Sequence, residues 1–260
     1  MEIQNDAFPV LNLQRLLRLP KGRKAQDMQR IMYSKYDEDW VTSNFFQVKS
    51  GQYPDAWWGH FISAARRRNA DLTLAADDRS LPTLRFWSSV PSPAEYESQS
   101  RGRVLKSGNT EWESRAKVAE PVEGPSEIDI MFDHDQFLFY VEAKPGADVS
   151  MSTTYDPQRN QIIRNIDCLI ASAGNRKPIF WLLVRDEALT RAYIQLINNY
   201  KADPSLLVRD LPHRNAKTLR SIAQNLTILL WSDFREWVCA PGFDPETAAV
   251  QRELERRILG

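Results

Sequence analysis

The chain has 260 residues, enough for one large domain, or for one domain with a small extension, whose core needs no disulfide or metal cross-links. Lys plus Arg and Asp plus Glu both number 34, which argues against a strongly basic nucleic-acid-coating protein but leaves room for a local basic cleft. The chain has only two cysteines, without metal-ligand spacing, which argues against a secreted disulfide scaffold. Because the sequence shows neither a signal peptide nor a run of about 20 apolar residues, we expect a cytoplasmic protein that does not enter a membrane.

Residues 1–75 are expected to form a helical N-terminal region. Apolar residues recur at helical spacing in 11–19 and in 25–36. The segment 53–68 carries Pro54 in its first turn and arginines in its last, and this order is typical of a helix.

The arginine run that ends this helix has two interpretations. Beside Trp57 and Trp58, its guanidinium groups could contact phosphates while the indole rings stack on bases. Alternatively, the arginines complement the helix dipole and the tryptophans pack inside. The candidate nucleic-acid-binding residues are Arg66, Arg67 and Arg68.

Residues 76–240 are expected to form the core domain, and residues 241–260 a C-terminal helix packed on it. Strands are predicted at 83–90, 111–120, 126–132, 137–144, 178–184 and 226–234. Helices are predicted at 92–103, 156–171, 187–201, 216–224 and 245–258, with Asp156 and Pro157 starting the second. A hairpin followed by strand–helix crossovers predicts a mixed sheet sandwiched between helices.

The hairpin "SEIDIMFDHDQFLFYVEAK" (126–144) concentrates the charges of this core. If 133–136 is its turn, paired residue numbers sum to 269, so Phe132 lies opposite Phe137 and Glu127 opposite Glu142. The polar face then carries Glu127, Asp129, Met131, Leu138, Tyr140, Glu142 and Lys144. The apolar face carries Ile128, Ile130, Phe132, Phe137, Phe139, Val141 and Ala143. A turn one residue longer or shorter would place Asp129 and Glu142 on opposite faces.

Carboxylates on a half-buried sheet are costly unless something pairs with them. Glu127 and Glu142 would be like charges directly across the hairpin, which favours a cation between them. Carboxylate oxygens suit a hard divalent cation such as Mg²⁺. The nearby Lys144 could orient or deprotonate a metal-bound water, or offset charge that develops on a phosphate. This chemistry fits hydrolysis of a phosphodiester.

An Asp on one strand followed by Glu-x-Lys on the next resembles the PD-(D/E)XK nuclease superfamily, which has the restriction-endonuclease-like fold. Asp129 and the run Glu142, Ala143 and Lys144 match its central motif, although Ile128 stands where the family has proline. The family pattern continues with a helix that carries a glutamine, supplied here by Gln158 or Gln161. The resemblance covers roughly residues 92–185.

The resemblance implies a three-layer α/β/α sandwich and an Mg²⁺- or Mn²⁺-dependent nuclease that cuts DNA or, less often, RNA. Asp129, Glu142 and the Ala143 carbonyl would bind the metal, and Lys144 would position the attacking water. Gln161, or else Gln158, would steady the lysine or the nearby backbone. Additional acidic groups would come from Glu127, and from Glu95 or Glu97 on the preceding helix. Many nucleases of this kind cut two strands as dimers, so a homodimer is compatible with the pattern.

Two other hypotheses stay open at this point. The chain could keep this fold as a catalytically silent nucleic-acid-binding or scaffold protein, or its hairpin could imitate the motif within an unrelated domain. Local signatures of Ser-His-Asp or Cys-His catalysis, of a phosphate-binding glycine loop and of a dinucleotide site are missing from the sequence. The three histidines are scattered, and none is assigned a role.

Overall fold

The protein is described here from a computed structural model that covers residues 38–53, 55–72, 74, 81–104, 122–144, 156, 159–185, 191–238 and 245–259. The helices predicted at 11–19 and 25–36, the strand predicted at 111–120, and Gln158 lie outside these residues. Within the described part of the chain, no helix combines the length and the apolar character needed to cross a membrane.

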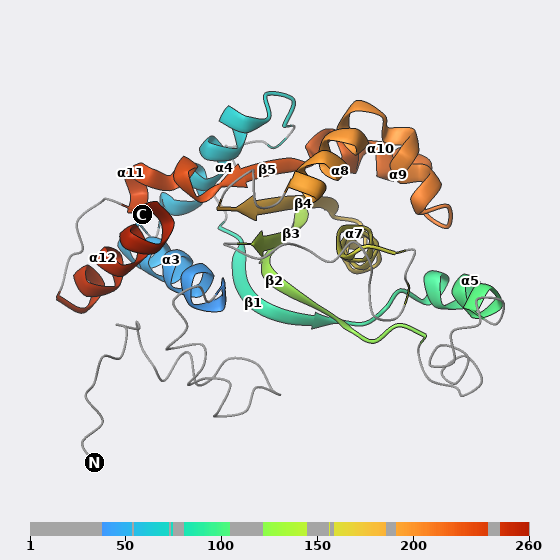
Figure 1. Cartoon of the computed structure of the whole chain (residues 1–260), viewed down its shortest axis with the longest axis horizontal. Coiled ribbons are helices and arrows are strands. Elements are labelled where there is room, and N and C mark those ends of the chain that lie inside the picture. Colours follow the sequence, from blue (N-terminus) through green and yellow to red (C-terminus); the bar gives the residue numbers. More distant parts are fainter. Residues whose placement is uncertain are drawn as a thin grey trace, which may run out of the picture.

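A five-stranded mixed sheet forms the centre of the protein, with the strands in the order β1-β2-β3-β4-β5 (Figure 1). The strands are β1 (Thr83–Val90), β2 (Ser126–Asp133), β3 (Phe137–Lys144), β4 (Lys177–Val184) and β5 (Thr227–Leu230). The pairs β1–β2 and β2–β3 are antiparallel, whereas β3–β4 and β4–β5 are parallel. The prediction of an α/β protein with a mixed sheet is therefore confirmed.

Helices cover both faces of this sheet (Figure 1). The side that we call the α4 face packs against α3 (Glu38–Gln52), α4 (Trp57–Arg68), η1 (Trp231–Phe234), α11 (Arg235–Val238) and α12 (Pro245–Leu259). The other side, the α7 face, packs against α7 (Gln161–Ala173), α8 (Arg191–Ala202), α9 (Pro204–Asp210) and α10 (Ala216–Asn225). Helix α5 (Ala94–Val104) follows β1 at one end of the sheet.

Aromatic side chains join the N-terminal helices to the α4 face. The Trp58 ring stacks on Phe137 of β3 with centroids 5.5 Å apart, and Phe61 stacks on Phe234 of η1 at 5.6 Å. Trp57 and Trp58 are both buried. Because large aromatic side chains bury most of their surface in such contacts, α3 and α4 share one core with the sheet.

Helix α7 begins later than predicted, at Gln161 rather than at Asp156. The side-chain oxygen of Asn160 accepts a hydrogen bond from the Ile163 N–H at 3.0 Å, so Asn160 is the N-cap. Asp156 instead accepts a hydrogen bond from the Tyr96 hydroxyl at 2.9 Å. The helix ends before Gly174, whose φ of 59° is easily adopted only by glycine.

The β2–β3 hairpin has a tighter turn than predicted. Asp133 pairs with Leu138 and Ile130 with Val141, so paired residue numbers sum to 271 and the predicted sum of 269 is wrong. The His134 N–H donates to the Phe137 carbonyl, which leaves Asp135 and Gln136 as the two turn residues. A shift of two residues keeps the paired residues Ile130 to Asp133 and Leu138 to Val141 on their predicted faces, because side chains alternate with a period of two.

Strand β2 changes its environment at Asp129. Its ladder with β3 covers Ile130 to Asp133, and Ile130 packs in the core of the α4 face, which agrees with its predicted place on the apolar face of the hairpin. Ile128 packs in the cluster of the α7 face instead, so its predicted place on the apolar face of the hairpin is wrong. In the neighbouring β1, Trp87 has φ 45°, a left-handed conformation that costs about 1–2 kcal/mol for a residue with a side chain. The change of face in β2 and the left-handed conformation in β1 both occur next to Asp129, where the β2–β3 pairing stops.

The predicted strand at 226–234 is shorter in the structure. Strand β5 ends at Leu230, whose N–H donates to the Asp233 carboxylate at 2.8 Å. This side-chain bond turns the chain into η1 and α11, which return to the α4 face.

Candidate active site

Two strands and one helix bring the predicted catalytic residues together on the α7 face. The ammonium group of Lys144 lies 2.8 Å from Glu142 Oε1 and 3.7 Å from Asp129 Oδ2. Asp129 Oδ2 also accepts a hydrogen bond from the Ala143 N–H at 2.9 Å. The acid on β2 and the Glu-Ala-Lys run on β3 therefore form one contiguous cluster.

Helix α7 contributes two side-chain amides to this cluster. Gln161 Nε2 donates to Glu142 Oε1 at 2.6 Å, and Asn165 Nδ2 donates to Glu142 Oε2 at 2.7 Å. Residues four apart lie on one side of a helix, so both amides point at the same carboxylate. The sequence predicted Gln161 at this place, whereas Asn165 was not assigned to the site, although its spacing from Gln161 could have identified it.

Glu142 is the most deeply buried ionisable residue of the cluster, with 1% of its surface exposed. Burial, and after it the nearby Asp129 carboxylate, raise the pKa of its carboxyl group to about 7, although Lys144 and Asn165 act to lower it. A divalent cation beside Asp129 and Glu142 would stabilise both ionised carboxylates, because it would replace their mutual repulsion with attraction.

The donors of this cluster fit a hard divalent cation. Two carboxylates and a backbone carbonyl are the oxygen ligands that Mg²⁺ and Mn²⁺ prefer. The Ala143 carbonyl points to the same side of β3 as its N–H, which faces Asp129. No group of three or more His, Cys, Asp or Glu side chains with metal-binding geometry occurs among the described residues, so further ligands would be backbone, water or substrate oxygens.

The additional acidic candidates are engaged at other places. Glu127 is exposed and lies outside the β2–β3 ladder, whose register does not place it opposite Glu142, so that predicted position is wrong. Glu95 forms an ion pair with Arg214 at 3.3 Å. The Glu97 carboxylate accepts hydrogen bonds from the backbone N–H groups of Val122 and Glu123, where it holds the segment that leads into β2.

The arginine run of α4 lies on the opposite side of the sheet from this cluster. Arg68 makes a two-pronged salt bridge with Asp233 at 2.7–2.9 Å, and Arg67 donates to the carbonyl of the same residue. Arg66 donates to the Leu74 carbonyl. These contacts, together with the buried Trp57 and Trp58, fit the interpretation in which the run ends a helix and anchors it.

Comparisons with known proteins add no family to this description. The chain matches no family model, no curated protein and no solved structure. Its function is therefore argued from the geometry of the cluster alone.

Proposed function

We propose that this protein is a metal-dependent nuclease that hydrolyses phosphodiester bonds, with DNA as its expected substrate. The observation that carries the proposal is the convergence on Glu142 of Lys144 from its own strand and of Gln161 and Asn165 from α7, with Asp129 beside them. The mixed sheet, with a hairpin followed by the crossover helix α7, is compatible with the restriction-endonuclease-like core that the motif implies. That core is part of the proposal.

Each residue of the cluster has a role in the proposed reaction. Asp129, Glu142 and the Ala143 carbonyl would hold Mg²⁺ or Mn²⁺, which when bound supplies Lewis acidity and lowers the pKa of a coordinated water. Lys144 would orient the attacking water and offset the negative charge that develops on the phosphate. Gln161 and Asn165 hold the Glu142 carboxylate in place through both of its oxygens.

The test of this function is a cleavage assay across substrates. Plasmid, linear duplex, single-stranded DNA and RNA would each be incubated with the purified chain in Mg²⁺, in Mn²⁺ or in EDTA. We expect cleavage of DNA that requires a divalent cation. Cleavage of RNA alone would reassign the substrate, whereas nucleic-acid binding without cleavage in any condition would indicate a silent binding protein and overturn the proposal.

A further inference from the structure

Strands β1 and β2 both change the face that their side chains occupy halfway along their length. Phe86 and its partner Ile130 pack on the α4 face. Further along β1, Val90 packs in the core of the α7 face. In a regular strand these two even-numbered residues of β1 would share one face, because side chains alternate with a period of two. The β1–β2 pair is therefore rotated about its length between Phe86 and Val90.

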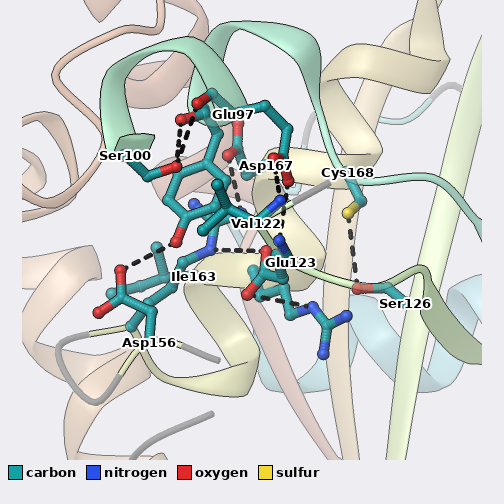
Figure 2. Close-up of polar contacts among 12 residues, drawn as sticks. Glu97, Ser100, Val122, Glu123, Ser126, Asp156, Ile163, Asp167 and Cys168 are labelled. Atoms are coloured by element: carbon teal, nitrogen blue, oxygen red, sulfur yellow. Dashed lines mark hydrogen bonds and ion pairs between the residues drawn. The ribbon is translucent and has the colours of Figure 1, made fainter. Parts of the chain in front are cut away.

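The first residues of β2 lie on the α7 face together with Val90. Ile128 packs in the core of that face. Ser126 pairs with Val90, and its hydroxyl accepts a hydrogen bond from the Cys168 thiol of α7 at 3.5 Å (Figure 2). Directly paired residues of two strands share a face, and here they do so on both sides of the change. The two strands therefore change face at the same place, and contacts with α7 hold the part beyond it.

The change of face occurs at Trp87 and Asp129. The β1–β2 register places these residues opposite each other, but the ladder skips them and resumes on either side. Trp87 has φ 45°, and no other residue except glycine has a positive φ in the described part of the chain. A residue in this conformation interrupts the alternation of an extended strand, as β-bulges do where they re-aim a side chain next to an active site. The backbone of Trp87 therefore marks the point at which the pair of strands rotates.

The Asp129 carboxylate lies where the rotated β2 leaves β3. If the β2–β3 ladder continued in its register, the Ala143 N–H would donate to the Ile128 carbonyl. The ladder stops at Ile130, and Asp129 Oδ2 accepts this N–H instead, at 2.9 Å. The same oxygen lies 3.7 Å from the ammonium group of Lys144. The side chain of Asp129 thus takes the place of a main-chain acceptor, and this place brings it to the lysine of the proposed site.

The conformation of Trp87 is strained, and the packing around it is fixed on both sides. Strained backbone persists only where the surrounding structure over-determines it, and it clusters at active sites. The Trp87 side chain is 4% exposed. The residues before it pack on the α4 face and those after it on the α7 face. The strained residue lies opposite an acid of the proposed site, so the strain has a consequence for that acid.

We propose that Trp87 is a positioning residue of the candidate active site. Its left-handed backbone, rather than its indole ring, rotates β1 and β2 and so directs the Asp129 carboxylate to the Ala143 N–H and the Lys144 ammonium group. The importance of this geometry for metal binding and cleavage rests on the proposed nuclease function, whereas the geometry itself does not.

The test measures amide hydrogen exchange of Ala143 in EDTA, relative to that of Val141, which pairs with Ile130 inside the ladder. The ratio of the two rates reports local opening at the Asp129 hydrogen bond, because global unfolding exposes both amides. Trp87→Gly adopts φ 45° without strain but lacks the indole ring, so its ratio should stay within about twofold of the wild type. Trp87→Val has a branched side chain that disfavours this φ, so its Ala143 should exchange about tenfold faster relative to Val141.

Ser89→Gly and Ser89→Val are the matched controls, because Ser89 is an exposed residue of the same strand and lies within the regular ladder. Both controls should leave the exchange ratio unchanged. If the indole ring positions Asp129, Trp87→Gly will raise the ratio at least as much as Trp87→Val, and this result would overturn the proposal. If Trp87→Val does not fold, Trp87→Gly decides alone, because loss of the Ala143 protection in that variant has the same meaning.

Mn²⁺ binding by the same variants connects this geometry to the proposed function. Trp87→Gly should bind the ion as the wild type does, and Trp87→Val should bind it about tenfold more weakly. Equal affinity in the two variants would overturn the role of Trp87 at the site. Exchange ratios in the expected order, with no Mn²⁺ binding by any chain, would refute the metal site and the nuclease function but not the positioning of Asp129.

Discussion

Replacing Glu142 by Gln should make the metal-free protein more stable than the wild type at pH 8. The gain in stability should be much smaller at pH 5. Burial and the neighbouring Asp129 raise the pKa of Glu142 from an ordinary 4.5 to about 7. At about 1.4 kcal/mol per pKa unit, this difference of about 2.5 units corresponds to about 3.5 kcal/mol of stability. A raised pKa in the folded state means that this stability is present below the unfolded-state pKa and is lost as the pH rises towards 7.

The assay is chemical denaturation of the wild type and of Glu142→Gln in EDTA at both pH values. The difference in unfolding free energy between the Gln variant and the wild type should grow by about 2–3 kcal/mol from pH 5 to pH 8. Hydrogen bonds that the substitution alters equally at both pH values do not contribute to this change. Added Mg²⁺ should stabilise the wild type at pH 8 and have little effect on the variant. An advantage that does not depend on pH would refute the assignment of Glu142 as a buried carboxyl group with a raised pKa.

Three further perturbations test other contacts. Asn165→Leu removes the donor to Glu142 Oε2 and should lower the free energy of unfolding by about 1.5–3 kcal/mol at pH 8. The loss should be smaller at pH 5 in the same denaturation series, because the partner of Asn165 is the ionised carboxylate. Equal losses at the two pH values would contradict that partner. Arg159→Met removes one of the cations that pair with the buried carboxylates of Glu123 and Asp167, which keep Arg164 and Arg214. It should cost about 3 kcal/mol of unfolding free energy, against at most about 1 kcal/mol for the more exposed control Arg256→Met. Equal losses in the two variants would contradict a special role for the Arg159 contacts. Trp87→Gly should be more stable than Trp87→Ala by about 1 kcal/mol in thermal unfolding, because only glycine adopts φ 45° without strain. The reverse order of the two variants would contradict that backbone conformation.

Most strands of the sheet, and the faces of the hairpin from Ile130 onward, could be predicted from side-chain alternation. The short strand predicted at 83–90 has the bounds of β1, and the apolar run at 178–184 gave β4 to within one residue. The hairpin register could not be predicted, because "DHDQ" lacks the glycine that normally marks a two-residue turn. The His134 Nδ1 instead accepts from the Gln136 N–H at 3.0 Å, and its ring stacks on Phe137 at 4.1 Å.

The candidate site was predicted in part. Asp129, Glu142, Lys144 and Gln161 lie together as the motif implies, because strand alternation and helix spacing act over short stretches of sequence. The group around Arg159 left no local signal. Its members come from four separate segments, and only the packing of α5, α7 and the α9–α10 loop brings their charges together.

The most direct test of the central claim measures Mn²⁺ binding and DNA cleavage on the same preparations of wild type, Asp129→Ala and Lys144→Ala. The account predicts that the wild type binds the ion and cleaves, that Asp129→Ala does neither, and that Lys144→Ala still binds the ion but no longer cleaves. Cleavage retained by both variants, or ion binding unchanged by Asp129→Ala, would contradict the assignment of Asp129, Glu142 and Lys144 as a metal-dependent active site.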